Sequence, residues 1–166
     1  MAQLSSPEEF FAFKLGIALQ MERTVLTMLR ELEGKASDEE LKQLLSHHRD
    51  ETEQQLQNLE QAFSALGKEA QGHQSPSIDG LKTEGRELLE KADESLVDSV
   101  IVGGAVGTEH HEIAVYESLI TMAEAQAADD VVALLQENLE QEQHTLKEMS
   151  RKAEELSRQQ AGAQAR

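Results

Sequence analysis

The chain has 166 residues, which is enough for one domain with a hydrophobic core. Its formal net charge of −17 argues against binding to nucleic acid or to an anionic membrane surface, because both depend on lysine and arginine. The sequence contains no cysteine, which excludes disulfides, iron–sulfur clusters and thiolate zinc sites. Two prolines, 3% aromatic residues and abundant glutamate, glutamine, leucine, alanine and lysine favour an all-α protein.

The sequence carries no evident membrane or export signal. The longest uncharged apolar run, residues 100–106, is far too short to span a bilayer. The N-terminus lacks the basic region followed by an apolar core that marks a secretory signal. We therefore expect a cytoplasmic protein.

The first long helix is expected over about residues 6–33. Ser6, with Pro7 at the first helical position and Glu9 three residues on, forms a capping box. Gly34 is a typical residue to end the helix.

A second long helix is expected over about residues 37–66. Ser37 and Glu40 repeat the capping signature at its start, and Gly67 follows its end. Because only a few residues join the first two helices, they must pack antiparallel.

The next segment is expected to cross from one end of a helical bundle to the other. Residues 68–78 are polar and predict a loop, and a short helix is expected over about residues 79–92. Its leucines Leu81, Leu88 and Leu89 are predicted to face inward. Helix connections in bundles usually have about two to eight residues, so this segment is unusually long.

Two further long helices are expected over about residues 93–126 and 129–159, followed by a frayed tail at 161–166. Two hairpins joined by one long crossover predict a ferritin-like four-helix bundle, forming a single domain over residues 1–166 with a short fifth helix in the crossover. The third long helix contains Gly103, Gly104 and Gly107, which each cost up to about 1 kcal/mol against alanine. We expect a close neighbour there, either the crossover segment or a second subunit.

Each of the four long helices carries a carboxylate or an imidazole within its apolar stripe. Glutamate is rarely buried unless it is paired or binds a metal, so this recurrence suggests a shared cation. The candidate metal ligands are Glu22 on the first helix, His48 and Glu51 on the second, Glu109 and Glu112 on the third, and Glu142 on the fourth.

Periodicity selects the acid on the fourth helix. Glu142 falls on the stripe that Leu135, Leu139, Leu146 and Met149 define, whereas Glu140 and His144 share the opposite, solvent-facing side. Glu137 is a second choice. On the third helix His110 and His111 flank the acidic pair without an assigned role, and Tyr116 is either a packed aromatic or a hydrogen-bond donor to a ligand.

The expected ligand set is rich in hard oxygen donors and has one imidazole, which suits iron or manganese better than zinc. Two metal ions, bridged by Glu112 and either Glu22 or Glu51, would account for the number of carboxylates. Iron is the first choice and manganese the second.

Three runs of this sequence resemble the YciE/YciF-like family, a ferritin-like group of bacterial proteins with a stress-associated function. They are HRDETEQQLQNLEQAFSALG at 48–67, TEHHEIAVYES at 108–118 and LEQEQ at 139–143. The wider ferritin and rubrerythrin group uses one glutamate on the first helix, which Glu22 matches. It uses Glu-x-x-Glu or a single glutamate on the third, which Glu109 and Glu112 match. The chain departs from the Glu-x-x-His pattern of that group, because Gln54 follows Glu51 and Thr145 follows Glu142 at that spacing.

The leading functional hypothesis is a dinuclear metal-binding protein that reacts with dioxygen or a peroxide in stress protection. The alternative is a non-catalytic helical-bundle protein, with a vestigial or structural metal site, that dimerises or binds a partner. The resemblance implies small oligomers, with a homodimer expected, rather than an iron-storage shell. No residue is assigned a catalytic role.

Overall fold

The computed structural model describes residues 3–164, and the side chains of residues 3–162. These residues form helices and connecting loops without any strand. In chain order the elements are α1 (Pro7–Glu33), α2 (Glu39–Ala65), α3 (Pro76–Lys91), the 3-10 turn η1 (Glu94–Leu96), α4 (Val97–Ala125) and α5 (Asp129–Gln164).

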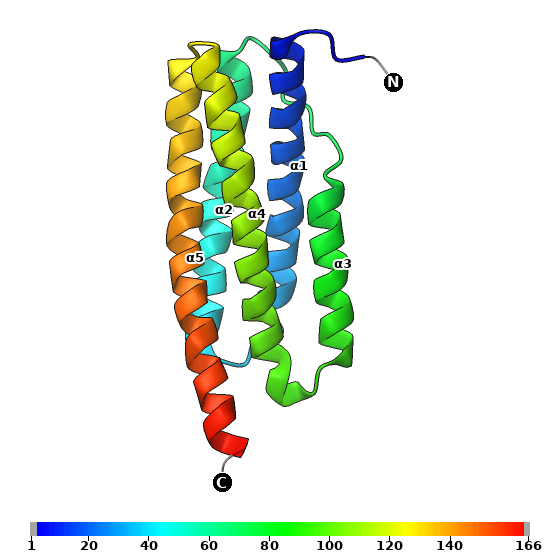
Figure 1. Ribbon diagram of the computed structural model, residues 1–166, viewed down its shortest axis with the longest axis vertical. Helices are drawn as coiled ribbons and strands as arrows, with labels where there is room; N and C mark the ends of the chain where they lie inside the picture. Colours follow the sequence, from blue (N-terminus) through cyan, green and yellow to red (C-terminus); the bar gives the residue numbers. More distant parts are fainter. Residues whose placement is uncertain (1–2, 165–166) are drawn as a thin grey trace.

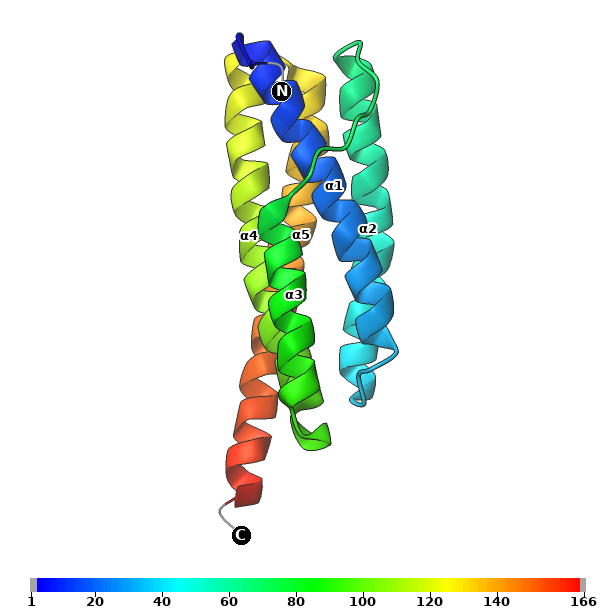
Figure 2. The same cartoon turned by 90° about the vertical axis from the view of Figure 1, so that its right-hand side faces the viewer.

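The four long helices pack as two antiparallel hairpins, α1 with α2 and α4 with α5 (Figure 1). The crossover runs from the end of α2 to the opposite end of the bundle, where α4 begins, and carries α3 along the outside of α1 and α4 (Figures 1 and 2). The predicted all-α four-helix bundle with a fifth helix in its crossover is therefore confirmed. Within residues 3–164, none of the helices has the length and apolarity needed to span a membrane.

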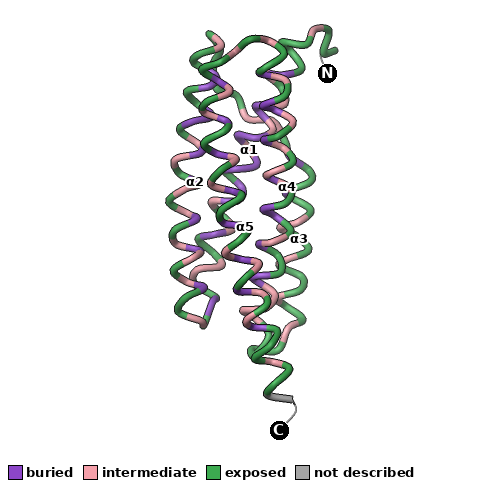
Figure 3. Tube along the Cα trace, turned by 60° about the vertical axis from the view of Figure 1, so that its left-hand side comes forward, coloured by how far each residue is buried: buried purple, intermediate pink, exposed green. Residues whose placement is uncertain are grey.

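The apolar stripes of the helices meet in one hydrophobic core. Figure 3 shows the buried residues recurring along the long helices between exposed ones. On α5 the buried positions alternate in steps of four and three, which keeps one side of the helix facing its neighbours. These positions are Val131, Leu135, Asn138, Glu142, Thr145, Met149, Lys152 and Leu156.

Capping differs in detail from the prediction at both of the first two helices. Ser6 caps α1 as expected by accepting from the backbone N–H of Glu9, but the Glu9 carboxylate accepts from the backbone and hydroxyl of Ser5. The cap of α2 is Asp38 rather than Ser37, because Asp38 accepts from the backbone N–H of Leu41 at 2.8 Å.

Three other expectations about the elements are wrong. The short helix begins at Pro76 instead of residue 79, and its Leu88 is 48% exposed, while Ile78 is buried and Leu81 and Leu89 are partly buried. The segment at 93–96 forms the turn η1 before α4 begins. The expected frayed tail is helical through Gln164, and residues 165–166 lie outside the described part.

The crossover segment does not pack closely against the glycines of α4, although it was one of the two neighbours expected there. A Cβ atom on Gly103, Gly104 or Gly107 would meet no atom within 4 Å in the described chain. The close approach occurs instead at Gly16 on α1, where a Cβ would collide with the carbonyl oxygen of Gln71 and the ring of His73. The backbone N–H of His73 also donates to the Gly16 carbonyl at 2.9 Å, so the crossover segment packs directly against α1 at this glycine.

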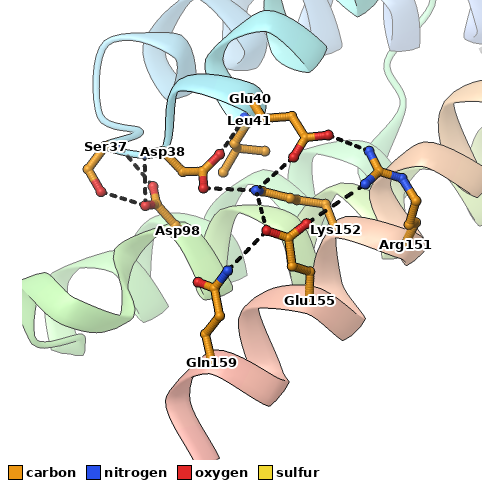
Figure 4. Close-up of polar contacts among 9 residues, drawn as sticks. All are labelled: Ser37, Asp38, Glu40, Leu41, Asp98, Arg151, Lys152, Glu155 and Gln159. Atoms are coloured by element: carbon orange, nitrogen blue, oxygen red, sulfur yellow. Dashed lines mark hydrogen bonds and ion pairs between the residues drawn. The ribbon is translucent and has the colours of Figure 1, made fainter. Parts of the chain in front are cut away.

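A polar cluster closes the end of the bundle at which α2 begins (Figure 4). Lys152 on α5 is 1% exposed, and its ammonium group lies 2.8 Å from Asp38 and 3.0 Å from Glu40. Asp98 on α4 accepts from the backbone and hydroxyl of Ser37. The start of α2 is thus bound to both helices of the other hairpin.

Replacing Lys152 by methionine should lower the free energy of unfolding by about 1–2 kcal/mol, because the carboxylates at Asp38 and Glu40 lose a shared charged donor. The matched control is Arg151→Met, which removes an exposed ion pair to Glu40 and should cost less than about 1 kcal/mol. Urea denaturation measures both values. Equal effects of the two substitutions would show that the buried ammonium has no special role.

Gly16→Ala should destabilise the fold by about 1–3 kcal/mol, since its methyl group has no room beside Gln71 and His73. Gly80→Ala on α3 is the control, because a Cβ there meets no atom within 4 Å and alanine favours the helix. Thermal melts of both variants check this. An unchanged Gly16→Ala melting temperature would contradict close packing of the crossover.

Candidate metal centre

The acidic and imidazole side chains of the stripes meet inside the bundle, one or two from each long helix. Glu22 comes from α1, His48 from α2, Glu109 and Glu112 from α4, and Glu142 from α5. Each of these residues is at most 1% exposed. Their burial follows from the sequence because each occupies a position of the apolar stripe, where a leucine would otherwise pack.

Four of the six predicted ligands form a tight group. His48, Glu109, Glu112 and Glu142 each offer one ligand atom, and these atoms all lie within 4.8 Å of one another. Nε2 of His48 is 3.0 Å from Oε1 of Glu109, yet neither ring nitrogen has a hydrogen-bond partner among the described residues. These atoms therefore lie close enough together for one cation to contact all four side chains.

Glu22 lies beside this group and is held by a tyrosine. The Tyr116 hydroxyl donates to Oε1 of Glu22 at 2.5 Å and accepts from the side-chain amide of Asn138 at 3.1 Å. Asn138 in turn accepts from the Asn58 amide at 2.8 Å. Both alternatives for Tyr116 hold, because its ring is fully buried in the core and its hydroxyl donates to Glu22. Oε2 of Glu22 has no hydrogen-bond partner in the described chain.

Glu51 lies at the margin of the cluster and is half-buried. Its Oε2 is 4.0 Å from Nδ1 of His48 and accepts a hydrogen bond from the Thr145 hydroxyl at 3.2 Å. Its other oxygen lies 3.4 Å from Nε2 of the exposed His47. Glu51 is therefore a neighbour of His48 that lies outside the tight group of four.

The cluster has many polar atoms that no protein group satisfies. Both carboxylate oxygens of Glu112 and of Glu142, and Oε2 of Glu109, are buried without a hydrogen-bond partner in the described chain. Buried polar atoms are normally paired, so such a concentration of unpaired oxygens requires a proton or a cation.

The electrostatics of the site agree with that requirement. Burial raises the pKa of Glu22 to about 8, and the charge of Glu142 adds to this effect. Burial also raises the pKa of Glu109 to about 7. Burial and the neighbouring carboxylates raise the pKa values of Glu112 and Glu142 well above the usual range. A divalent cation would substitute for the protons and hold the carboxylates ionised.

The donor set fits a hard metal ion. Carboxylate oxygens dominate, one imidazole is present, and the described chain offers no thiol, a combination suited to iron or manganese. The residues that would hold the metal are His48, Glu109, Glu112 and Glu142, with Glu22 beside them.

Sequence reasoning assigned no site role to two buried amides. Gln55 is fully buried, neither of its amide atoms has a partner in the described chain, and it lies close enough to Glu142 to lower the pKa of that acid. Asn138 holds Tyr116 in place. Their spacing could have identified both residues, because Gln55 lies two helical turns after His48 and Asn138 lies one turn before Glu142.

The remaining candidates point away from the cluster. Glu137, Glu140 and His144 are exposed, as predicted for the last two, so Glu137 is not an alternative to Glu142. His110 is exposed, and His111 is half-buried with its pKa lowered by burial and by the charge of Lys14.

Comparison with known proteins gives one family and several relatives. The family model described as domain of unknown function (DUF892) matches residues 6–162. Protein YciF of Escherichia coli (strain K12) is 29% identical over 140 residues, which cover 83% of this chain and 84% of the relative. These matches confirm the resemblance visible in the sequence.

Solved structures share the fold. The candidate structural protein YcfI from Rhodopseudomonas palustris has a TM-score of 0.87 and 32% identity, over 89% of this chain and 95% of that chain. The Escherichia coli stress protein YciF has a TM-score of 0.87 and 26% identity, over 93% and 98%. A protein from Xanthomonas campestris pv. campestris, at 20% identity over 97% and 100%, has a TM-score of 0.76 and shows likeness of fold alone.

The metal-free protein should lose stability as the pH rises from 5.5 to 8.5. A carboxylic acid whose folded pKa is raised above its unfolded value of about 4.3 stabilises the fold at low pH, and this contribution is lost as pH rises through the folded pKa. With Glu109 at about 7 and Glu22 at about 8, the loss falls in this window. Melting temperatures of chelator-treated protein across the window test this, and saturating Mn²⁺ should reverse the trend. A metal-free melting temperature that rises with pH would contradict it.

Proposed function

The chain belongs to the DUF892 family, and we propose that its buried cluster binds two metal ions, iron or else manganese, that react with dioxygen or a peroxide in stress protection. The observation that supports this most strongly is the concentration of unpartnered buried carboxylate oxygens around His48. The description of one relative, YciF of Escherichia coli, as a stress protein supports the physiological setting.

In this proposal the protein holds the metal and controls protons. Bound iron or manganese would act as a Lewis acid and redox centre toward the oxidant. Tyr116 fixes the orientation of Glu22 through its hydrogen bond to Oε1, and leaves Oε2 free to carry a proton. In the metal-free protein burial raises the pKa of Glu22 to about 8, so this carboxyl group can carry a proton near neutral pH and release it when a metal binds. The apolar side chains packed around the cluster limit its contact with bulk water.

The second candidate is a non-catalytic bundle protein whose metal, if it binds one, is structural. Two observations favour it: the description of YcfI as a candidate structural protein, and the single imidazole in the cluster. We also propose that the chain forms a homodimer in either case, which light scattering checks directly. The two functions differ in peroxide chemistry, because only the first predicts faster peroxide consumption by the metal-loaded protein than by the same free metal.

Glu112→Gln should weaken metal binding by at least about tenfold, because the substitution removes a charged oxygen donor from the centre of the cluster. The same change should raise the melting temperature of the metal-free protein at pH 8, since a neutral amide replaces an acid whose pKa is raised. Elemental analysis after anaerobic loading with Fe²⁺ or Mn²⁺, followed by peroxide decay, measures binding and activity.

Glu117→Gln is the matched control, because Glu117 is an exposed glutamate on the same helix. It should keep about two metal ions per chain, the number that two-metal sites hold, and should keep wild-type peroxide consumption. A wild-type protein that takes up no metal and melts at the same temperature with and without it would refute the proposal. Normal metal content with no peroxide consumption would favour the second candidate.

A further inference from the structure

A cavity of about 370 Å³ is lined by residues of α1, α2, α3 and α4 and reaches the candidate metal centre from the side on which α3 packs. Its inner end is formed by His48 and Glu109, and its walls are mainly apolar, with Val25, Leu29, Leu45 and Ile101 among them. Ligand pockets typically span about 300–1,000 Å³, so the space suits a small organic molecule. Figure 2 shows α3 running beside α4 and α1 over this half of the bundle.

Two glycines keep the cavity open. Gly85 on α3 and Gly104 on α4 both line it, and a Cβ on either one would meet no atom within 4 Å. A glycine inside a helix costs up to about 1 kcal/mol against alanine, and nothing in the described bundle packs closely against these two. The internal packing of the bundle therefore does not explain why residue 104 is a glycine, whereas the open space of the cavity does.

The more exposed part of the cavity lining has three basic residues against two acidic ones, although the chain as a whole is strongly acidic. Lys35, Lys82 and Arg86 line it together with Glu31 and Glu90. Arg86 bridges α3 to Glu31 on α1 at 2.7 and 2.8 Å, and its hydrogen bond, with added attraction from Lys82 and Lys35, lowers the pKa of Glu31. Lys35 and Lys82 form no ion pair of their own among residues 3–162, so two ammonium groups are available to an anion.

We propose that this cavity binds an aliphatic monocarboxylic acid, with its carboxylate at Lys35 and Lys82 and its hydrocarbon chain extending along the apolar walls toward His48 and Glu109. The two lysines at the mouth select for the carboxylate of the ligand, and the apolar walls select for its hydrocarbon chain. The inference deepens the proposed function by naming the class of organic molecule that is brought to the cluster. Binding itself requires no metal.

Calorimetric titration of the metal-free protein with hexanoate, octanoate and decanoate tests the proposal. Each added CH₂ group should tighten binding by about fourfold while the chain still fits. Octanoate should bind about fivefold more tightly than octan-1-ol, and the double variant Lys35→Gln/Lys82→Gln should abolish that preference. Folded protein that shows no saturable octanoate binding would overturn the proposal, as would equal affinity for octanoate and octan-1-ol in the wild type.

Gly104→Leu should fill the cavity and weaken octanoate binding by at least about tenfold, while Gly103→Leu, on the same helix but outside the cavity lining, should leave it unchanged. If Gly104→Leu fails to fold, Gly85→Leu with Gly80→Leu as its control gives the same comparison on α3. Equal weakening by a cavity variant and its control would overturn the assignment of the site.

Two further outcomes identify the occupant of the cavity and its relation to the metal. If a second copy of the chain fills the groove, Gly104→Leu will shift the oligomeric state in light scattering and octanoate will bind only the dissociated form, which overturns the aliphatic acid as the occupant. If the protein binds octanoate but takes up no metal, the inference stands and the proposed function fails. If the protein takes up metal but does not bind octanoate, the proposed function stands and the inference fails.

Discussion

The fold depends on how the bundle accommodates the four buried carboxyl groups of Glu22, Glu109, Glu112 and Glu142. Moving an ionised carboxylate out of water costs far more than a domain of this size can spare, unless a proton or cation compensates. Within residues 3–162 the buried residue among the lysines and arginines is Lys152, and it pairs with Asp38 and Glu40 rather than with the cluster. The compensating charge must therefore come from solution, so the ionic state of the site is coupled to the stability of the fold.

This coupling also explains why the fold needs strong contacts elsewhere. The centre of the bundle contributes repulsion when it is ionised, so the ends and the crossover must hold the helices in place. Asp98 and Lys152 attach the start of α2 to the second hairpin, and Gly16 lets the crossover chain lie directly on α1. These contacts keep the ligand side chains in register whether protons or a metal occupy the centre.

The arrangement of helices and the burial of the acids were predictable because both follow from a period of 3.6 residues. Periodicity separated buried Glu142 from exposed Glu140, two residues away. It did not distinguish Asp38 from Ser37 as a cap, because both residue types can cap and the choice depends on Asp98, 60 residues further along the chain. The amide of Gln55 and the open space beside Gly104 depend on what faces them across helices, which a single helix pattern does not specify.

The two sides of the cluster along α2 differ in chemistry, because one is polar and the other is apolar. Beyond His48 toward the end of α2, Asn58 and Asn138 continue the hydrogen-bonded chain that begins at Glu22 and Tyr116. On the other side, Leu45 and the walls of the cavity present hydrocarbon. A polar network can orient a carboxylate but gives an apolar molecule no room, whereas the cavity offers room without fixed donors near the cluster. In the proposed complex the organic molecule would therefore approach from the α3 side, where His48 and Glu109 are the cluster residues that line the cavity.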